Sequence, residues 1–299
     1  MKTITKNAMN ITTQCVQQEI NILSSLDHPN LVSFVDSYED CEHYHIVTEY
    51  CAGGEIMERY AKKGGFSESE VTEIMYQAFS AVDYLHEMGI THRDIKPENF
   101  LFKRDDIDDF SIKLIDFGFA TYFNEDTPIT SNIVGTPSYL APEMIEGAHD
   151  QRCDNWSLGV VMYVLITGHF PFSGERTTKL FKAIRESRLD LSGRYWKDIS
   201  KEAKQVVKGL LEKDPKKRMT AKQALEHRWI KERQSLLPKG ERVSVAVSDV
   251  TDQPRLSDEK TISNNSTQTG ANSRNESFEE RRSFKDETPC VLQEEITPD

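Results

Sequence analysis

The chain has 299 residues, of which 37% are hydrophobic, and a formal net charge of −12 at pH 7. This acidic balance argues against a general nucleic-acid-binding protein, which is normally basic. The five cysteines are scattered without a CxxC pair, which argues against a disulfide framework or a zinc knuckle and favours a reducing compartment. No apolar run of about 18 residues and no secretory leader is evident, so we expect no membrane contact and a cytoplasmic or nuclear location.

The first 50 residues predict a small unit of mixed helix and strand. Apolar residues recur at helical spacing in CVQQEINILSSL, residues 15–26, which predicts a helix. The runs LVSFVDSYED (31–40) and YHIVTEY (44–50) are typical of strands. We therefore assign residues 1–50 to a small lobe that contains a sheet, and residues 51–55 (CAGGE) to a hinge.

Residues 56–232 predict a larger, mainly helical lobe, so the predicted fold class is α+β. Five stretches have an apolar stripe at helical spacing: residues 67–89, 156–168, 177–187, 200–213 and 220–230. The first of them opens with a Ser and Glu start signature. Residues 233–299 are rich in Ser, Thr, Asn and Glu, and we expect them to form a disordered tail.

The stretches THRDIKPENFLF (91–102) and SIKLIDFGFA (111–120) carry candidate chemistry. Asp94 and Asn99 lie five residues apart with Lys96 between them, and Asp116 follows a short apolar run. Carboxylate and amide oxygens suit Mg²⁺, and a lysine suits an anionic phosphoryl group. These residue types predict chemistry that depends on positioning and charge neutralisation rather than on a strong nucleophile.

HRDIKPEN, DFG and APE, in this order and spacing, resemble the catalytic loop, the metal-binding loop and the end of the activation segment of eukaryotic protein kinases. The resemblance implies a two-lobed kinase fold that uses ATP and Mg²⁺. By this resemblance Asp94 would orient the substrate hydroxyl and accept its proton, and Asn99 and Asp116 would hold Mg²⁺. Lys96 would contact the γ-phosphate, and Thr136 would bond to Asp94 and Lys96. A lysine and a threonine at these places are typical of Ser/Thr kinases.

The same resemblance implies a second set of residues around the nucleotide. Lys2 would lie on a strand opposite Glu19, the Glu49 carbonyl and the Cys51 N–H would bond to adenine, and Thr48 would be the gatekeeper. Three further residues belong to this set by resemblance: Glu55 and Glu98 match acidic residues of the family, and Leu101 matches an apolar residue at the site. In basophilic relatives such acids favour an arginine three residues before the target Ser or Thr.

Other contacts implied by the resemblance are structural. Glu143 would pair with Arg218, and Asp154 would brace the catalytic loop around His92 and Arg93. A column of packed side chains would couple the lobes: Leu23, Phe34, His92 and Phe117.

Within the kinases, residues 2 to about 232 are most similar to the calcium/calmodulin-dependent group, especially the plant- and protist-type calcium-dependent kinases. LDHPNLV, EYCAGGEIMERY, GHFPFSG and DPKKRMTAKQALEHRWI carry this similarity. No D-x-[DN]-x-[DN]-G loop occurs, so we expect no direct Ca²⁺ binding. The expected partners are protein substrates with basic residues before Ser or Thr, and the expected state is a monomer.

One departure leaves a second function open. In the family, a glycine-rich loop (G-x-G-x-x-G) lies ahead of the strand that carries the lysine. No such loop precedes Lys2 in this sequence. The alternative is therefore a catalytically impaired pseudokinase or a truncated, kinase-shaped binding module. We interpret the start as an incomplete gene model or an internal methionine, and expect a strand that begins at Lys2 to have little pairing.

Two further segments carry candidate phosphorylation sites. The activation-loop insert NEDTPITSN offers Thr127, Thr130 and Ser131, although it is more typical of a plain polar loop. In the tail, Ser277 in RNES has an arginine three residues before it and is a candidate for autophosphorylation.

Overall fold

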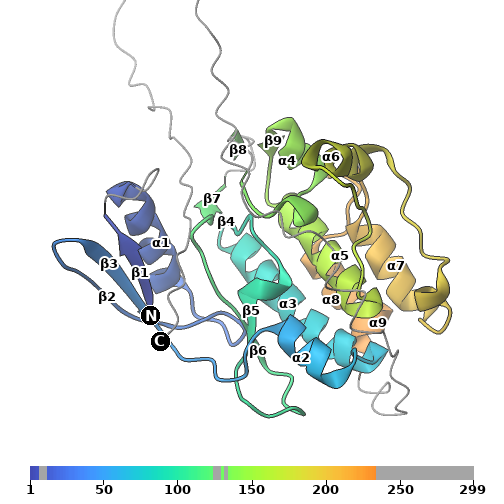
Figure 1. The fold of residues 1–299 in the computed structure, drawn as a ribbon, viewed down its shortest axis with the longest axis horizontal. Coiled ribbons are helices and arrows are strands. Elements are labelled where there is room, and N and C mark those ends of the chain that lie inside the picture. Colours follow the sequence, from blue (N-terminus) through green and yellow to red (C-terminus); the bar gives the residue numbers. More distant parts are fainter. Residues whose placement is uncertain (7–11, 124–128, 131–133, 234–299) are drawn as a thin grey trace, which may run out of the picture.

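The computed structural model describes residues 1–6, 12–123, 129–130 and 134–233. A small sheet with one helix beside it lies at one side of the molecule, and a larger helical region lies at the other (Figure 1). The predicted α+β fold, with a small sheet lobe and a helical lobe, is confirmed. The predicted tail lies outside the described residues except for Arg233, as do Thr127, Ser131 and Ser277.

The small lobe contains a three-stranded antiparallel sheet in the order β1-β3-β2. Its strands are β1 (Lys2–Thr5), β2 (Phe34–Glu39) and β3 (His43–Thr48). All four residues of β1 pair with β3, from Lys2 opposite Ile46 to Thr5 opposite His43. The expectation that this strand would have little pairing is therefore wrong, because a single neighbouring strand holds it along its whole length.

Helix α1 (Thr13–Ser25) belongs to the same lobe and begins where the sequence places a capping residue. The Thr12 side chain accepts a hydrogen bond from the Cys15 N–H, which satisfies one of the free donors of the first turn. Its buried positions, among them Val16 and Leu23, lie at helical spacing. This face packs into the core that both lobes share.

The helical lobe is built around two long helices, α3 (Glu68–Glu87) and α5 (Arg152–Thr167). A capping box between Ser67 and Glu70 starts α3, as the Ser and Glu signature predicts. Helix α5 is buried almost all round, which is typical of a central helix. The shorter helices are α2 (Ile56–Lys63), α4 (Pro142–Glu146), α6 (Thr177–Glu186), α7 (Lys201–Leu210), α8 (Ala221–Glu226) and α9 (Arg228–Lys231).

The single helix predicted over residues 220–230 is two helices in the structure, α8 and α9. His227 between them has an extended backbone (φ −67°, ψ 146°), and its side chain accepts a hydrogen bond from the Trp229 N–H. A side chain that caps a new helix in this way competes with continuation of the old one. The apolar spacing alone did not show this break.

Short antiparallel strand pairs bring the candidate loops together. The catalytic loop connects β4 (Ile90–Thr91) to β5 (Phe100–Phe102), with the 3₁₀ turn η1 (Pro97–Asn99) just before β5. The DFG loop begins one residue after β6 (Ile112–Leu114), which pairs with β5. The other short elements are β7 (Thr121–Tyr122), β8 (Ile129–Thr130), β9 (Ala148–His149), η2 (Pro137–Tyr139) and η3 (Arg194–Trp196).

The hinge is tied to β5 by backbone hydrogen bonds. The Gly53 N–H donates to the Phe102 carbonyl at 2.9 Å, and the Phe102 N–H donates to the Gly54 carbonyl at 2.9 Å. A Cβ on Gly53 would lie 2.2 Å from the Arg104 carbonyl oxygen, so the close approach requires glycine. Among the described residues, no helix has the length and apolar character to cross a membrane.

Candidate active site

Asp94 lies at the centre of the candidate site and is only 4% exposed. Its Oδ1 accepts hydrogen bonds from the Thr136 N–H at 3.0 Å and from the Thr136 hydroxyl at 2.9 Å. Its Oδ2 lies 2.8 Å from Lys96 Nζ, and the Asn99 amide nitrogen donates to the Asp94 carbonyl at 2.8 Å. The four residues that the catalytic motif and the activation segment supply therefore form one hydrogen-bonded group around a single carboxylate.

Lys96 is held as a cation within this group. Its Nζ also donates to Thr136 Oγ1 at 3.1 Å, so both contacts predicted for Thr136 are present. Burial lowers the pKa of Lys96, but the charge and hydrogen bond of Asp94 outweigh this effect and raise the pKa above its ordinary value. A positive charge therefore lies directly beside the carboxylate that would receive a proton.

The backbone of the catalytic loop is braced by Asp154, which is fully buried on α5. Its carboxylate accepts the N–H of His92 at 2.9 Å and the N–H of Arg93 at 2.8 Å, and it contacts the His86 ring at 3.0 Å. Arg93 has a positive φ of 68°, a conformation that is strained for a residue with a side chain. The two hydrogen bonds thus offset local strain and hold the loop that presents Asp94.

Lys2 connects the small lobe to the DFG loop. Its Nζ lies 3.0 Å from Glu19 Oε1 on α1 and 2.8 Å from Asp116 Oδ1. Burial lowers the pKa of Lys2, but the charges of Glu19 and Asp116 raise it well above its ordinary value. Burial raises the pKa of Asp116, but Lys2 and the Gly118 N–H hold it below its ordinary value. The predicted partner of Lys2 is therefore in place, and both ends of the bridge are charged.

Asn99 and Asp116 provide a donor set that fits Mg²⁺. The Asn99 carbonyl accepts the Ile115 N–H at 2.9 Å, which places the two residues on adjoining segments. The Asn99 amide nitrogen is bonded to Asp94, so its amide oxygen is the atom left for a cation. An amide oxygen and an ionised carboxylate are hard oxygen ligands of the kind that Mg²⁺ prefers.

The hinge leaves two backbone groups available. The Glu49 N–H donates to the Ser33 carbonyl at 2.9 Å, and its carboxylate accepts from the Ser33 N–H at 2.8 Å and from Lys113 Nζ at 2.6 Å. In the described part of the chain, the Glu49 carbonyl and the Cys51 N–H form no backbone hydrogen bond. These are the two groups predicted to bond to adenine. Thr48 ends β3 beside them.

Lys113 is a functional-site neighbour that sequence reasoning missed. It is 4% exposed, and its Nζ donates to the Leu31 carbonyl at 3.0 Å as well as contacting Glu49. On β6 it lies opposite Leu101, which also forms a bridge with Glu55 in the hinge. A lysine inside the apolar strand run was the one signal that could have pointed to a buried ion pair here.

Acidic side chains gather where the hinge meets α2. Burial raises the pKa of Glu55, the negative charges of Glu58 and Glu98 raise it further, and Lys96 offsets this only in part. Glu98 is exposed on η1, beside the catalytic loop. Sequence reasoning identified Glu55 and Glu98 but missed Glu58. Together the three acids form a negative surface next to the reacting group.

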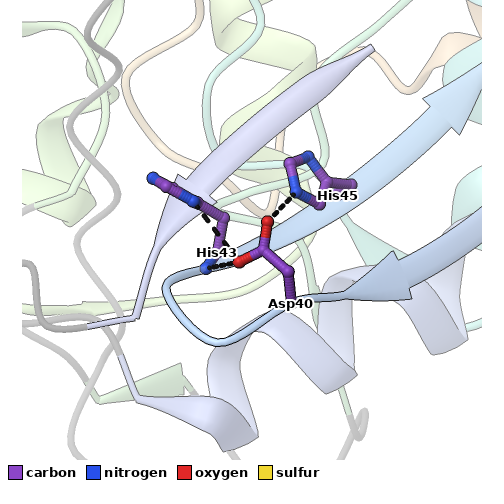
Figure 2. Close-up of side chains that lie close together, drawn as sticks. All are labelled: Asp40, His43 and His45. Atoms are coloured by element: carbon purple, nitrogen blue, oxygen red, sulfur yellow. Dashed lines mark hydrogen bonds and ion pairs between the residues drawn. The ribbon is translucent and has the colours of Figure 1, made fainter.

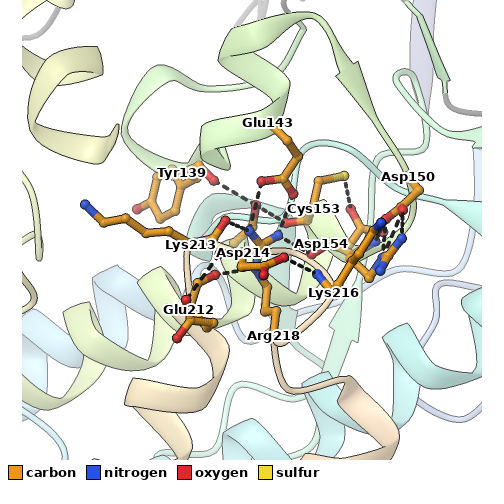
Figure 3. A network of polar contacts seen from close by, with 12 residues as sticks. Tyr139, Glu143, Asp150, Cys153, Asp154, Glu212, Lys213, Asp214, Lys216 and Arg218 are labelled. Atoms are coloured by element: carbon orange, nitrogen blue, oxygen red, sulfur yellow. Dashed lines mark hydrogen bonds and ion pairs between the residues drawn. The ribbon is translucent and has the colours of Figure 1, made fainter. Parts of the chain in front are cut away.

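The Glu143–Arg218 pair lies at the base of the activation segment (Figure 3). Arg218 is 3% exposed and bonds to both carboxylate oxygens of Glu143, at 2.5 and 2.8 Å. It also donates to the carbonyls of Glu212 at 2.9 Å and Arg152 at 2.8 Å. The predicted pair is therefore present, and it joins the segment after α7 to α4 and α5.

One direct contact of the predicted packing column, between His92 and Phe117, is present. The rings of His92 and Phe117 meet edge to face, with centroids 5.1 Å apart, and both residues are fully buried. Leu23 is 3% exposed, and Phe34 packs against the same core. Leu23 on α1 and Phe34 on β2 therefore belong to one hydrophobic core with Phe117 of this aromatic pair.

Comparison with known proteins agrees with this geometry. Residues 1–230 match the protein kinase domain family, so the chain belongs to that family. Calcium-dependent protein kinase 3 of Plasmodium berghei is 42% identical over 217 residues, 73% of this chain and 39% of that protein. Calcium-dependent protein kinase 12 of Oryza sativa subsp. japonica is 42% identical over 218 residues, 73% of this chain and 40% of that protein.

A calcium/calmodulin-dependent protein kinase of Emericella nidulans is 38% identical over 232 residues, which are 77% of this chain and 56% of that protein. These names confirm the resemblance to the calcium/calmodulin-dependent kinase group. The chain spans about two fifths of the length of the first two relatives. Protein kinases generally use ATP and Mg²⁺.

Proposed function

We propose that this protein transfers the γ-phosphoryl group of ATP to serine and threonine hydroxyls of other proteins. The observation that carries the proposal is the joining of two charged groups in one site. Asp94, Lys96 and Thr136 form the first group, and Lys2 with Asp116 forms the second. Residues far apart in the sequence thereby lie together as charged, hydrogen-bonded groups, which supports a reaction that depends on positioning and charge neutralisation.

In this mechanism Asp94 orients the substrate hydroxyl and accepts its proton. Its Oδ1 is occupied by two Thr136 donors, which fixes the plane of the carboxylate. Lys96, paired with Oδ2 in this structure, would neutralise the charge of the transferred group. Asp154 keeps the loop in place through the His92 and Arg93 N–H groups.

Nucleotide binding would use the residues on the other side of the site. Lys2, positioned by Glu19, would hold phosphate oxygens, and the Glu49 carbonyl and Cys51 N–H would bond to adenine. Asn99 and Asp116 would hold Mg²⁺, which neutralises phosphate charge when bound.

The acidic surface supports a preference for substrates with a basic residue before the target. Burial and the negative charges of Glu58 and Glu98 raise the pKa of Glu55, so its ionised form lacks compensating positive charge. A guanidinium placed among them would relieve this repulsion. We therefore propose that substrates carry an arginine three residues before the phosphorylated Ser or Thr. We also propose that the protein acts as a monomer and has an intracellular location.

The direct test is transfer of labelled phosphate from Mg-ATP to an Arg-x-x-Ser peptide. We expect Asp94→Asn to abolish transfer while leaving the unfolding midpoint nearly unchanged. KM for an Ala-x-x-Ser peptide should be at least about tenfold higher than KM for the Arg-x-x-Ser peptide. This difference should be smaller in the Glu98→Gln variant. Transfer by the wild-type protein that Asp94→Asn leaves intact would refute the assignment of the base.

The alternative is a kinase-shaped binding module without turnover. A shift in the unfolding midpoint with Mg-ATP, but no transfer to any basic peptide, would favour that function. If the protein showed no nucleotide binding and no phosphate transfer, that result would contradict both functions.

A further inference from the structure

A separate cluster of potential ligand side chains lies on the hairpin that joins β2 to β3 (Figure 2). Asp40, His43 and His45 each offer one ligand atom, and these atoms lie within 4.8 Å of one another. His43 and His45 are two residues apart on β3, so their rings are on the same face of the strand. Both imidazoles face the Asp40 carboxylate, which comes from the turn between the strands.

The spacing of these atoms is close to that of a metal coordination shell. His45 Nε2 lies 3.1 Å from Asp40 Oδ2, and His43 Nδ1 lies 3.5 Å from Asp40 Oδ1. Ligands at about 2.0–2.2 Å from a tetrahedral Zn²⁺ are separated from one another by about 3.3–3.6 Å. All three ligand atoms lie within 4.8 Å of one another, so side-chain rotations that shorten the longest separation would bring them onto one ion.

His45 is held in position by both neighbouring strands. Its Nδ1 lies 3.1 Å from the hydroxyl of Thr3, its partner in the β1–β3 register. Its ring stacks on Tyr38 of β2, with centroids 4.6 Å apart. In this structure the contact of Nε2 with the Asp40 carboxylate is a hydrogen bond in which Nε2–H donates. When Nε2 binds an ion instead, Nδ1–H can donate to the Thr3 hydroxyl, which directs the Nε2 lone pair at the cluster. Histidines that bind metal ions usually have such an outer hydrogen bond.

Asp40 is also fixed before any ion binds. Its Oδ1 accepts the N–H groups of Glu42 and His43, both at 2.7 Å. Lys6, a neighbouring cation, is bonded to the Asp40 carbonyl and is paired with Glu39 at 3.1 Å. A simple turn explains the two backbone hydrogen bonds of Asp40, but it does not require two imidazoles to converge on the same carboxylate.

We propose that Asp40, His43 and His45 form a binding site for one Zn²⁺ ion, with water as the fourth ligand. Two imidazole nitrogens and one carboxylate suit Zn²⁺, whereas Ca²⁺ and Mg²⁺ take sets of oxygen ligands. The bound ion joins the turn to β3. Through the hydrogen bond of His45 with Thr3 it also stabilises β1, the strand that carries Lys2.

The proposal is tested by titrating the purified full-length chain, stripped of metal and kept reduced, with ZnCl₂ in a calorimeter. We expect one site with a Kd of about 10 µM or tighter. His43→Asn and His45→Asn should each weaken binding at least about 100-fold, and Thr3→Val about tenfold through loss of the outer hydrogen bond. CaCl₂ should give no saturable heat from this site.

Two neighbouring residues provide matched controls. Glu42→Gln removes an exposed charge beside the cluster, and Cys41→Ser removes the exposed thiol of the same turn, so both should bind within about twofold of wild type. The wild-type unfolding midpoint should rise with Zn²⁺ above its own value in EDTA, whereas neither histidine variant should show such a rise. Absence of stoichiometric binding, wild-type affinity in the histidine variants, or loss of binding in Cys41→Ser would overturn the proposal.

Discussion

Replacing Glu143 by glutamine should destabilise the helical lobe by several kilocalories per mole. The change keeps the size of the side chain but removes the charge that both Arg218 nitrogens contact at 2.5 and 2.8 Å. Arg218 is 3% exposed, and its carbonyl partners on Glu212 and Arg152 carry no full charge. The guanidinium would therefore stay buried without the carboxylate that it contacts directly.

The magnitude follows from which charge is left behind. Breaking a buried pair by removal of one partner costs about 3–5 kcal/mol, because the remaining charge is desolvated without compensation. The backbone carbonyls around Arg218 still accept its hydrogen bonds and reduce this cost. We therefore expect Glu143→Gln to lower the free energy of unfolding by about 3 kcal/mol. In a domain of this size, that loss lowers the unfolding midpoint by about 6–12 °C.

The assay is equilibrium unfolding in urea followed by tryptophan fluorescence. Trp156, Trp196 and Trp229 are all buried in the helical lobe, so their emission reports the unfolding of the part that contains the pair. The double variant Glu143→Gln/Arg218→Met should be less destabilised than the sum of the single variants by at least about 1.5 kcal/mol, since it removes the stranded charge.

The exposed Glu175–Lys179 pair on α6 and its preceding loop is the matched control. Its side chains are 83% and 63% exposed, so Glu175→Gln should cost no more than about 0.5 kcal/mol. Equal losses for Glu143→Gln and Glu175→Gln, or strict additivity in the double variant, would refute the reasoning about the buried charge.

Three further predictions follow from other contacts. Lys2→Met should lower kcat/KM for Mg-ATP at least about 100-fold, because it removes the cation between Glu19 and Asp116; steady-state kinetics that match wild type would contradict this. Burial raises the pKa of Asp154, but its hydrogen bonds and nearby histidines lower it below its ordinary value. The stabilising effect of the ionised carboxylate is therefore present above about pH 4 and is lost as the pH falls. In the Asp154→Asn variant, the free energy of unfolding should depend less on pH between about pH 5 and 2 than in wild type. Ser67→Ala removes the side-chain cap of α3 and should cost about 1 kcal/mol in urea unfolding; no loss would show that the capping box is dispensable.

Much of the fold could be predicted because its signals are local. The capping box at Ser67 and the apolar spacing of α1 and α5 depend on residues within a few positions of one another. The break at His227 could not be predicted, because the apolar pattern continues across it and only the observed backbone shows the new cap. The full pairing of β1 with β3 likewise depends on a partner about forty residues away.

The sequence by itself determined the family resemblance and the identity of the reacting groups, because HRDIKPEN, DFG and APE set residue types at close spacing. Only the tertiary structure decided which distant side chains meet. The Lys113–Glu49 pair, the third acid Glu58 beside Glu55, and the convergence of two histidines on Asp40 are of this kind. The physical reason is that long-range pairing depends on how strands and helices pack, and a linear pattern of residue types does not contain those distances.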